Sequence, residues 1–303
     1  MIEQELIASD GHKIQLYVWR PESPKAWVHI NHGMSEHALR YEGLAQELVN
    51  AGYAVVAHNH RGHGSSETSQ LGSYAEVNGW EKVLTDLTEV RAAVCDASLP
   101  FYLFGHSMGS FIVQSYLCHH NHAIDGLILS GSNMQPAALT RIAKFVAQFE
   151  KLRLGRDKSS ALMQFLSFGS FNQTFKPCRT QYDWLSRDHA QVDKYIADPL
   201  CGFDCSIGLW HDLLSALIPL FEKSSLAKIQ ANLPIFMLGG AKDPVGMMGK
   251  GLPNLAKAYK NVGQNNVSLK VYEDGRHEML NEINHDEVMT DIVQWLDAQC
   301  LRA

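Results

Sequence analysis

The sequence predicts an α/β protein, with a mostly parallel sheet, helices on both faces and a helical cap inserted between two strands. Three observations predict this fold. Short apolar runs recur along the chain, helical patterns lie between them, and the alternation stops between about Met134 and Ile229. Alternating strands and helices indicate a parallel sheet that is covered on both faces. The 303 residues are enough to bury one large core.

Seven runs have the length and composition of strands. They are His12–Trp19, Trp27–Asn31, Tyr53–His58, Phe101–Gly105, Leu127–Ser130, Ile235–Gly239 and Val267–Tyr272. Most are apolar throughout, as expected for strands covered on both faces. The first two runs are too close in sequence to be joined by a crossover helix, so we expect the sheet to begin antiparallel.

Helical spacing of apolar residues marks the segments between the strands. Four such segments belong to the sheet region: Leu39–Ala51, Trp80–Cys95, Met108–His119 and Glu287–Leu301. Three more lie in the stretch without strands: Ala137–Leu154, Asp183–Ile196 and Leu209–Phe221. The first of these is amphipathic, with Leu139, Ile142, Val146, Phe149 and Leu152 near one face. We therefore expect a core of residues 1–133 and 230–303 and a cap of residues 134–229.

The composition excludes several classes of protein. There are 26 Lys and Arg against 32 Asp and Glu, a formal net charge of −6, so we expect no nucleic-acid partner. The first ten residues carry three acids and lack the apolar region of a signal peptide. No apolar run approaches the roughly 18 residues of a membrane span. Six cysteines without a CxxC pair indicate reduced thiols, hence a cytoplasmic protein.

The sharpest motif is GHSMG at residues 105–109, which has the pattern GxSxG. It follows a predicted strand and opens a predicted helix, the context in which this pattern exposes a nucleophile. Gly105 and Gly109 let the strand and helix pass close together at a sharp turn. We predict Ser107 as a nucleophile, and the alternative is a plain tight turn.

A serine hydroxyl needs a base, and the base needs an acid that orients it. His277 follows the last predicted strand, and Asp243 follows the strand before it. Loops after parallel strands open into the same crevice as Ser107. We therefore predict a catalytic set of Ser107, Asp243 and His277. The alternative for His277 is an ordinary surface histidine, since the chain has 15 histidines in all. The alternative for Asp243 is a turn aspartate before Pro244.

Acyl transfer also needs two backbone N–H groups that face the developing oxyanion. One is expected from Met108, which follows the nucleophile, and the other from Met34 in the loop after the strand ending at Asn31. Glu36 and His37 either brace that loop or begin an exposed helix. The residues expected to shape this part of the site are His32, Gly33, Gly105, His106 and Gly109.

A second histidine pattern, His58-x-His60-x-x-His63, has the spacing of dinuclear zinc hydrolases. Gly62 stands where that motif has an aspartate, and no later histidine is clearly placed as a further ligand. We interpret the segment as a turn shaped by glycine at a strand end. The sequence predicts no metal and no cofactor.

These motifs together resemble the lysophospholipase and monoacylglycerol lipase branch of the α/β hydrolases. The resemblance extends over residues 10–300 and rests on NHGMSEH at 31–37, RGHGS at 61–65, GHSMG at 105–109, Asp243 and GRHEMLNE at 275–282. It implies an eight-stranded sheet and a lipid ester substrate. Asn59 departs from the pattern, since the branch often has an aspartate two residues before Arg61.

We therefore expect a serine hydrolase that cleaves a monoacylglycerol or lysophospholipid through an acyl-enzyme on Ser107. A short-chain carboxylesterase and an aminopeptidase are the rival enzymes. Glu150, Asp183 and Asp204 are cap acids that could recognise a peptide amino terminus. A binding protein without activity is the rival of another class, although an intact triad argues against it. The sequence leaves the acyl length, the head group and the oligomeric state open.

The cap carries a basic stretch from Arg141 to Lys158. Six basic residues oppose two acids there, a charge of +4 in a chain of −6. Because it overlaps the amphipathic segment with Phe145 and Phe149, we expect either peripheral contact with an anionic membrane or a solvated basic face over an ordinary packed helix.

Overall fold

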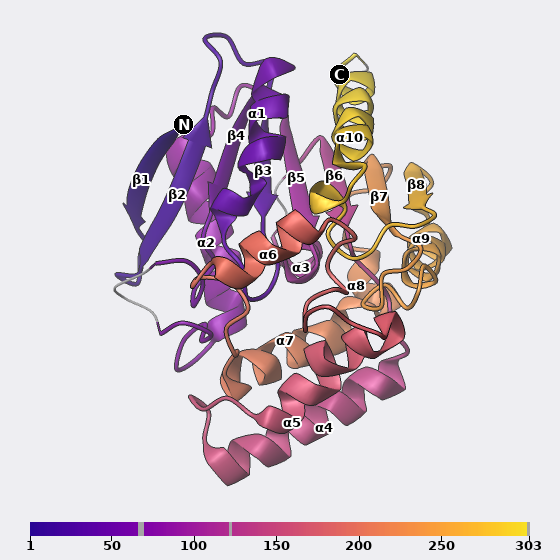
Figure 1. The fold of residues 1–303 in the computed structure, drawn as a ribbon. Helices are drawn as coiled ribbons and strands as arrows, with labels where there is room; N and C mark the ends of the chain where they lie inside the picture. Colours follow the sequence, from indigo (N-terminus) through magenta and orange to yellow (C-terminus); the bar gives the residue numbers. More distant parts are fainter. Residues whose placement is uncertain (66–69, 121–122, 302–303) are drawn as a thin grey trace.

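The computed structural model describes residues 1–65, 70–120 and 123–301. Eight strands form one sheet in the order β1-β2-β4-β3-β5-β6-β7-β8 (Figure 1). Their bounds are β1 Ile2–Ile7, β2 Lys13–Trp19, β3 Ala26–Asn31, β4 Tyr53–His58, β5 Phe101–His106, β6 Gly126–Ser130, β7 Ile235–Gly240 and β8 Val267–Tyr272. The strands from β3 to β8 are parallel, which confirms the predicted sheet.

The sheet begins antiparallel, but not by the predicted pairing. β2 pairs with β1 on one side and with β4 on the other, where Leu16 lies opposite His58. The sequence analysis missed β1 because Glu3, Gln4 and Glu5 interrupt its apolar residues. Such polarity suits an edge strand that is exposed along most of its length.

Helices cover both faces of the sheet. α1 (Glu42–Asn50) and α10 (His285–Cys300) pack on one face, and α2 (Gly79–Val94), α3 (Met108–His119) and α9 (Gly251–Asn261) pack on the other. The predicted bounds of α3 are met, and α10 begins two residues earlier than predicted. The sequence analysis did not include α9. Leu252, Leu255, Ala256 and Tyr259 repeat there at helical spacing and are all buried.

Only helices and loops, apart from one isolated bridge between Ser159 and Ser206, are described between β6 and β7. We call residues 134–229 the cap. Its helices are α4 Ala137–Leu154, α5 Ala161–Gln164, η2 Phe165–Gly169, η3 Asn172–Phe175, α6 His189–Ala197, α7 Ile207–Leu220 and α8 Lys223–Leu226. α4 packs along α7, and Figure 1 shows both, with α5, below one end of the sheet. No helix among the described residues is long and apolar enough to cross a membrane.

Two cap helices differ from the predicted bounds. α7 begins at Ile207 rather than Leu209, after Ser206, whose side chain accepts from the N–H of Leu209. α6 begins at His189 rather than Asp183, because Asp188 caps it by accepting from the N–H groups of Ala190 and Gln191. α4 has the predicted bounds, and most of its apolar face is exposed, a point that the sequence analysis had left open. Most of its large apolar side chains are exposed, and Phe145 is 75% exposed; the others are Leu139, Ile142, Phe149, Leu152 and Leu154.

Candidate active site

Ser107 lies at the turn between β5 and α3. Its φ is +50°, which residues other than glycine rarely adopt. The turn is held because the N–H of Ser107 donates to the carbonyl of Ser130 at 2.9 Å. A Cβ on Gly105 would lie 2.6 Å from the carbonyl oxygen of Gly109, and one on Gly109 would collide with that of Asn31. Both glycines are therefore required for the strand and helix to approach this closely.

The three residues predicted as a catalytic set lie in hydrogen-bond contact. The Ser107 hydroxyl is 2.9 Å from Nε2 of His277, and Nδ1 of His277 is 3.0 Å from Oδ2 of Asp243. The other carboxylate oxygen of Asp243 accepts from the N–H of Val245 at 2.9 Å. Asp243 and His277 are buried. This chain of contacts has the geometry of a nucleophile, a base and an orienting acid.

The charge of Asp243 changes the basicity of His277. Burial alone would lower the pKa of the imidazole, but the facing carboxylate and its hydrogen bond more than offset burial, so the pKa lies above its ordinary value. The neighbouring His106 has a pKa lowered to about 4, first by burial and then by the proximity of His277. His106 is therefore neutral where its ring packs 4.8 Å from that of His277.

The predicted oxyanion loop lies against Ser107. A Cβ on Gly33 would be 3.3 Å from that of Ser107, and Met34 and Met108 line one cavity with Ser107. Among the described residues, no hydrogen bond engages the N–H of Met34 or Met108. The loop is fixed through His32, whose Nε2 accepts from the N–H of His60 and whose Nδ1 donates to the carbonyl of Gly33.

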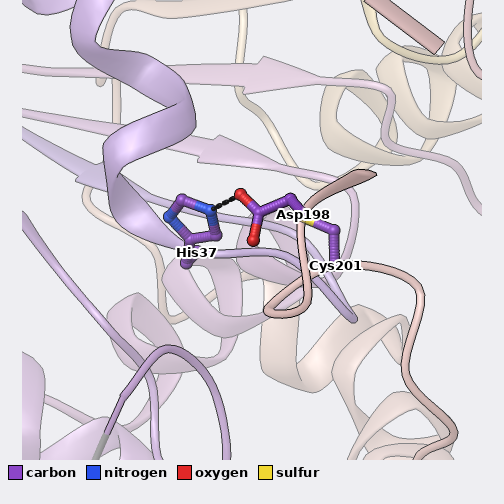
Figure 2. A group of neighbouring side chains, drawn as sticks. All are labelled: His37, Asp198 and Cys201. Carbon is purple, nitrogen blue, oxygen red and sulfur yellow. Dashed lines mark hydrogen bonds and ion pairs between the residues drawn. The ribbon is translucent and has the colours of Figure 1, made fainter. Parts of the chain in front are cut away.

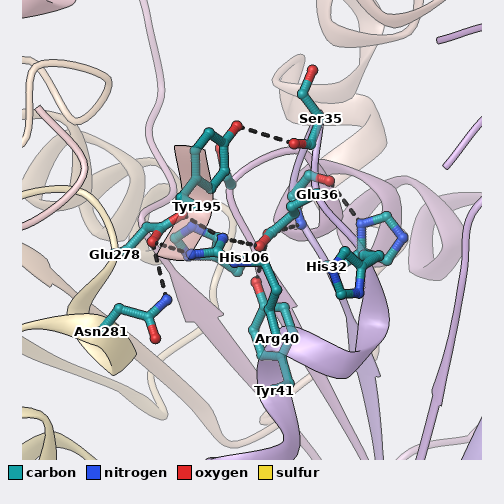
Figure 3. Close-up of polar contacts among 12 residues, drawn as sticks. His32, Ser35, Glu36, Arg40, Tyr41, His106, Tyr195, Glu278 and Asn281 are labelled. Carbon is teal, nitrogen blue, oxygen red and sulfur yellow. Dashed lines mark hydrogen bonds and ion pairs between the residues drawn. The ribbon is translucent and has the colours of Figure 1, made fainter. Parts of the chain in front are cut away.

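Buried charges connect this loop to the loop that carries His277 (Figure 3). Glu36 accepts from the N–H of Gly33 at 2.5 Å and from the hydroxyl of Tyr41 at 2.8 Å. Its other oxygen binds Arg40, whose guanidinium also forms two hydrogen bonds, of 2.6 and 2.7 Å, with Glu278. Because Glu278 follows His277 directly, one ion-pair network positions both the loop of Gly33 and His277. We call Glu36, Arg40 and Glu278 the arginine bridge.

A cap segment supports His277 from the other side. The ring of Trp184 lies 5.2 Å from that of His277, and the carbonyl of Leu185 accepts from the N–H of Glu278 at 2.8 Å. The guanidinium of Arg276 donates to carbonyl groups of this segment, and Arg187 binds Glu282 at 2.8 Å. The cap is therefore tied to the loop that carries His277.

Ser107 opens into a cavity of about 300 Å³ between the core and the cap. Its walls are mostly apolar and come from α3, α5, η2 and α7. The lining includes Phe111, Met163, Phe168, Trp210, Leu213, Leu214 and Leu217. None of the described lining residues is acidic or basic. Such a cavity accepts an apolar chain rather than a charged group.

The family model described as "Serine aminopeptidase, S33" matches residues 22–284. The chain belongs to this family. Human monoglyceride lipase is 28% identical over 305 residues, covering 98% of this chain and 91% of its own. The monoacylglycerol lipase of Mycolicibacterium smegmatis is also 28% identical, covering 97% and 96%. The predicted resemblance to this branch of the α/β hydrolases is confirmed.

The solved structures agree with the family assignment. A thermostable carboxyl esterase from Bacillus coagulans, in complex with glycerol, superimposes with a TM-score of 0.89 at 25% identity over 99% of this chain and 98% of its own. The protein is thus a serine hydrolase with the α/β-hydrolase fold.

The structure shows what two residues that the sequence analysis singled out do in this S33 member. Asn59, where the branch often has an aspartate, still braces its loop: its oxygen accepts from the N–H of Ala38 and its nitrogen donates to Gln15. Glu36, left open between a brace and an exposed helix start, is buried in the arginine bridge. The sequence analysis did not include Arg40, Glu278 or Trp184. The spacing of Glu36 and Arg40 is the only signal that could have indicated the bridge.

The histidines of the HxHxxH pattern are buried beside two others. His58 lies 2.8 Å from His29 between ring nitrogens, and the ring of His60 packs against those of His32 and His58. Burial lowers the pKa of every member, to about 3 for His58 and about 4 for His63. We call His29, His32, His58, His60 and His63 the histidine cluster. It packs as neutral rings beneath the oxyanion loop.

Proposed function

We propose that this enzyme hydrolyses monoacylglycerols, or lysophospholipids of the same single-chain form, through an acyl-enzyme on Ser107. The observation that carries the proposal is the position of Ser107 in an uncharged, mostly apolar cavity of about 300 Å³. The cavity suits one acyl chain and offers no charged partner for a peptide amino terminus. The names of the two relatives, a monoglyceride lipase and a monoacylglycerol lipase, support the same substrate class.

The proposed reaction has two steps. His277 takes the proton of Ser107 as the hydroxyl attacks the ester carbonyl, and Asp243 stabilises the resulting imidazolium. The N–H groups of Met34 and Met108 bind the oxyanion. The alcohol leaves with the proton from His277. Water activated by the same histidine then releases the fatty acid and restores the serine.

The aminopeptidase alternative is less well supported, because each cap acid that the sequence analysis singled out is engaged elsewhere. Glu150 binds Arg153 and Ser160, Asp183 accepts from Thr180, and Asp204 binds Gln164. None of the three lines the cavity. A short-chain carboxylesterase remains the second candidate, because the B. coagulans structure is a carboxyl esterase.

A substrate panel separates these activities. We expect kcat/KM to rise with acyl length by up to about fourfold per CH₂, since burying one CH₂ is worth about 0.8 kcal/mol, until the cavity is filled. Long-chain monoacylglycerols should exceed acetate and butyrate esters, and aminoacyl amides should not be cleaved. Highest kcat/KM on short esters would favour the carboxylesterase, and cleavage of an aminoacyl amide would favour the peptidase.

We also propose that the open face of α4 contacts anionic membranes and delivers lipid to the cap. Leu162 of α5 and Phe165 and Leu166 of η2 are exposed as well. Basic residues, among them Lys144 and Lys151, lie on the same helix. Exposed apolar residues beside lysines are the combination that binds the surface of an anionic bilayer.

Vesicle binding tests this contact. Binding to anionic vesicles should exceed binding to neutral ones and should weaken with salt. Lys144→Glu with Lys151→Glu should lower activity on vesicle-borne monoacylglycerol and spare a soluble short-chain ester. The matched control, Lys257→Glu with Lys260→Glu on α9, should change neither. Equal binding to both vesicle types, or equal loss on both substrates, would contradict the contact.

A further inference from the structure

Three side chains with metal-binding atoms meet where the cap returns to the core (Figure 2). His37 follows the oxyanion loop, Asp198 directly follows α6, and Cys201 lies three residues further on. Their ligand atoms all lie within 4.8 Å of one another, and no other group of three His, Cys, Asp or Glu does so among the described residues. Nε2 of His37 is 2.8 Å from Oδ2 of Asp198.

The backbone holds these side chains in place. The carbonyl of Asp198 accepts from the N–H of Cys201 at 3.0 Å, which closes the turn between the two ligands. The N–H of Gly202 and the hydroxyl of Tyr195 both donate to the carbonyl of Ser35, at 2.9 and 3.0 Å. The turn is therefore anchored two residues before His37, and little ordering is needed to bring the three ligands together.

The surrounding charges favour a cation. Among the described residues that act most strongly on Cys201, Arg40 is the one cation, and Glu36 and Glu278 both bind its guanidinium. With Asp198, three carboxylates face one guanidinium, a formal excess of two negative charges before any thiol ionises. The side chain of Asp198 is 32% exposed, which leaves a path from solvent.

We propose that His37, Asp198 and Cys201 bind one Zn²⁺. An imidazole nitrogen, a thiolate sulfur and a carboxylate oxygen are the donors that zinc prefers, whereas Mg²⁺ and Ca²⁺ take oxygen ligands. Water fills the fourth position. The thiol releases its proton to solvent on binding, and the imidazole carries its proton on Nδ1. The bound ion links the core after the oxyanion loop to the returning cap, so it restrains the cap.

Metal binding is measured on the purified full-length chain by competition with a chromogenic chelator. We expect one Zn²⁺ per chain, and a loss of affinity of about 100-fold or more in Cys201→Ser and in His37→Ala, because even residues behind a ligand are worth about 10–100-fold. Cys178→Ser and His285→Ala are matched controls and should bind as the wild type does. Co²⁺ should give a thiolate charge-transfer band that Cys201→Ser lacks.

Two further readouts keep the test independent of misfolding and of the catalytic site. Zinc should raise the melting temperature of the wild type and of Ser107→Ala, but not that of Cys201→Ser, whose metal-free melting temperature serves as the check on its fold. Saturating zinc should slow ester turnover by the wild type and not by Cys201→Ser. Absence of binding, unchanged affinity in Cys201→Ser, or binding that is lost only in His277→Ala would overturn the proposal.

Discussion

Ser107 lies between two walls of different chemistry. The polar wall contains His277, Asp243 and the arginine bridge, joined by hydrogen bonds of 2.5–3.0 Å. The apolar wall consists of α3 and the cap helices, which meet through side-chain packing around the cavity. A directional contact is lost entirely when one partner is removed, whereas packing changes by degrees. Substitutions in the polar wall should therefore abolish activity, whereas substitutions in the apolar wall should shift the preference among substrates.

The largest effects should come from the hydrogen-bonded chain of the polar wall. Ser107→Ala and Asp243→Asn should each lower kcat by about 10⁴-fold or more, with the folded state retained, because members of such a set act together. Steady-state kinetics measure kcat, and circular dichroism measures whether each variant is folded. In the wild type, kcat/KM should rise with pH around a midpoint above the ordinary histidine value of about 6.5, since the pKa of His277 is raised.

A different carboxylate would complete the set if Asp243→Asn retained activity near that of the wild type. The matched variant Asp274→Asn alters an exposed carboxylate in the loop after β8 and should leave kcat unchanged.

The arginine bridge should dominate stability on the same wall. Arg40→Met leaves Glu36 and Glu278 buried without their cation and should cost about 3–5 kcal/mol in the free energy of unfolding. Arg179→Met breaks an exposed pair with Asp193 and should cost no more than about 1 kcal/mol. Urea unfolding compares the two. Equal costs would mean that the bridge is not a determinant of the site.

The histidine cluster should make the stability of the folded protein sensitive to acid. Its pKa values are lowered in the folded state, so the unfolded chain binds more protons below about pH 6.5. The free energy of unfolding should therefore fall as the pH drops below 6.5, by up to about 1.4 kcal/mol per pH unit for each histidine. His277, with a raised pKa, contributes in the opposite direction.

One member of the cluster tests this slope. Both ring nitrogens of His60 lack partners among the described residues, so His60→Phe should not reduce stability at neutral pH. It should reduce the dependence of the free energy of unfolding on pH by the equivalent of about one proton. His285→Phe, at a half-exposed position of α10, should leave the slope unchanged. An unaltered slope in His60→Phe would place the acid sensitivity elsewhere.

Changes to the apolar wall should have the smallest effect on chemistry. Leu217→Trp fills part of the cavity and should lower kcat/KM for long-chain monoacylglycerol by about fourfold for each CH₂ excluded, while a short-chain ester is unaffected. Leu269→Trp, on the exposed edge strand β8, is the matched control. Equal loss on both substrates would show that the two walls are not separable.

The two walls also differ in how far the sequence predicts them. Ser107, Asp243 and His277 follow strand ends, so topology alone brings them together, and glycines fix the turn at Ser107. The arginine bridge depends on contacts across 238 residues, between Arg40 and Glu278, which no local pattern encodes. The sequence left open whether the apolar face of α4 is exposed or packed for a related reason, because an apolar face in the sequence does not reveal what covers it.

The account makes one central claim, that Ser107 is the nucleophile toward single-chain lipid esters. Labelling with a fluorophosphonate, followed by peptide mapping, tests it most directly. We predict one modified serine, Ser107, no label in Ser107→Ala, and protection by long-chain monoacylglycerol at concentrations where a short-chain alcohol gives none. Label on another serine, or labelling that monoacylglycerol does not slow, would contradict the claim.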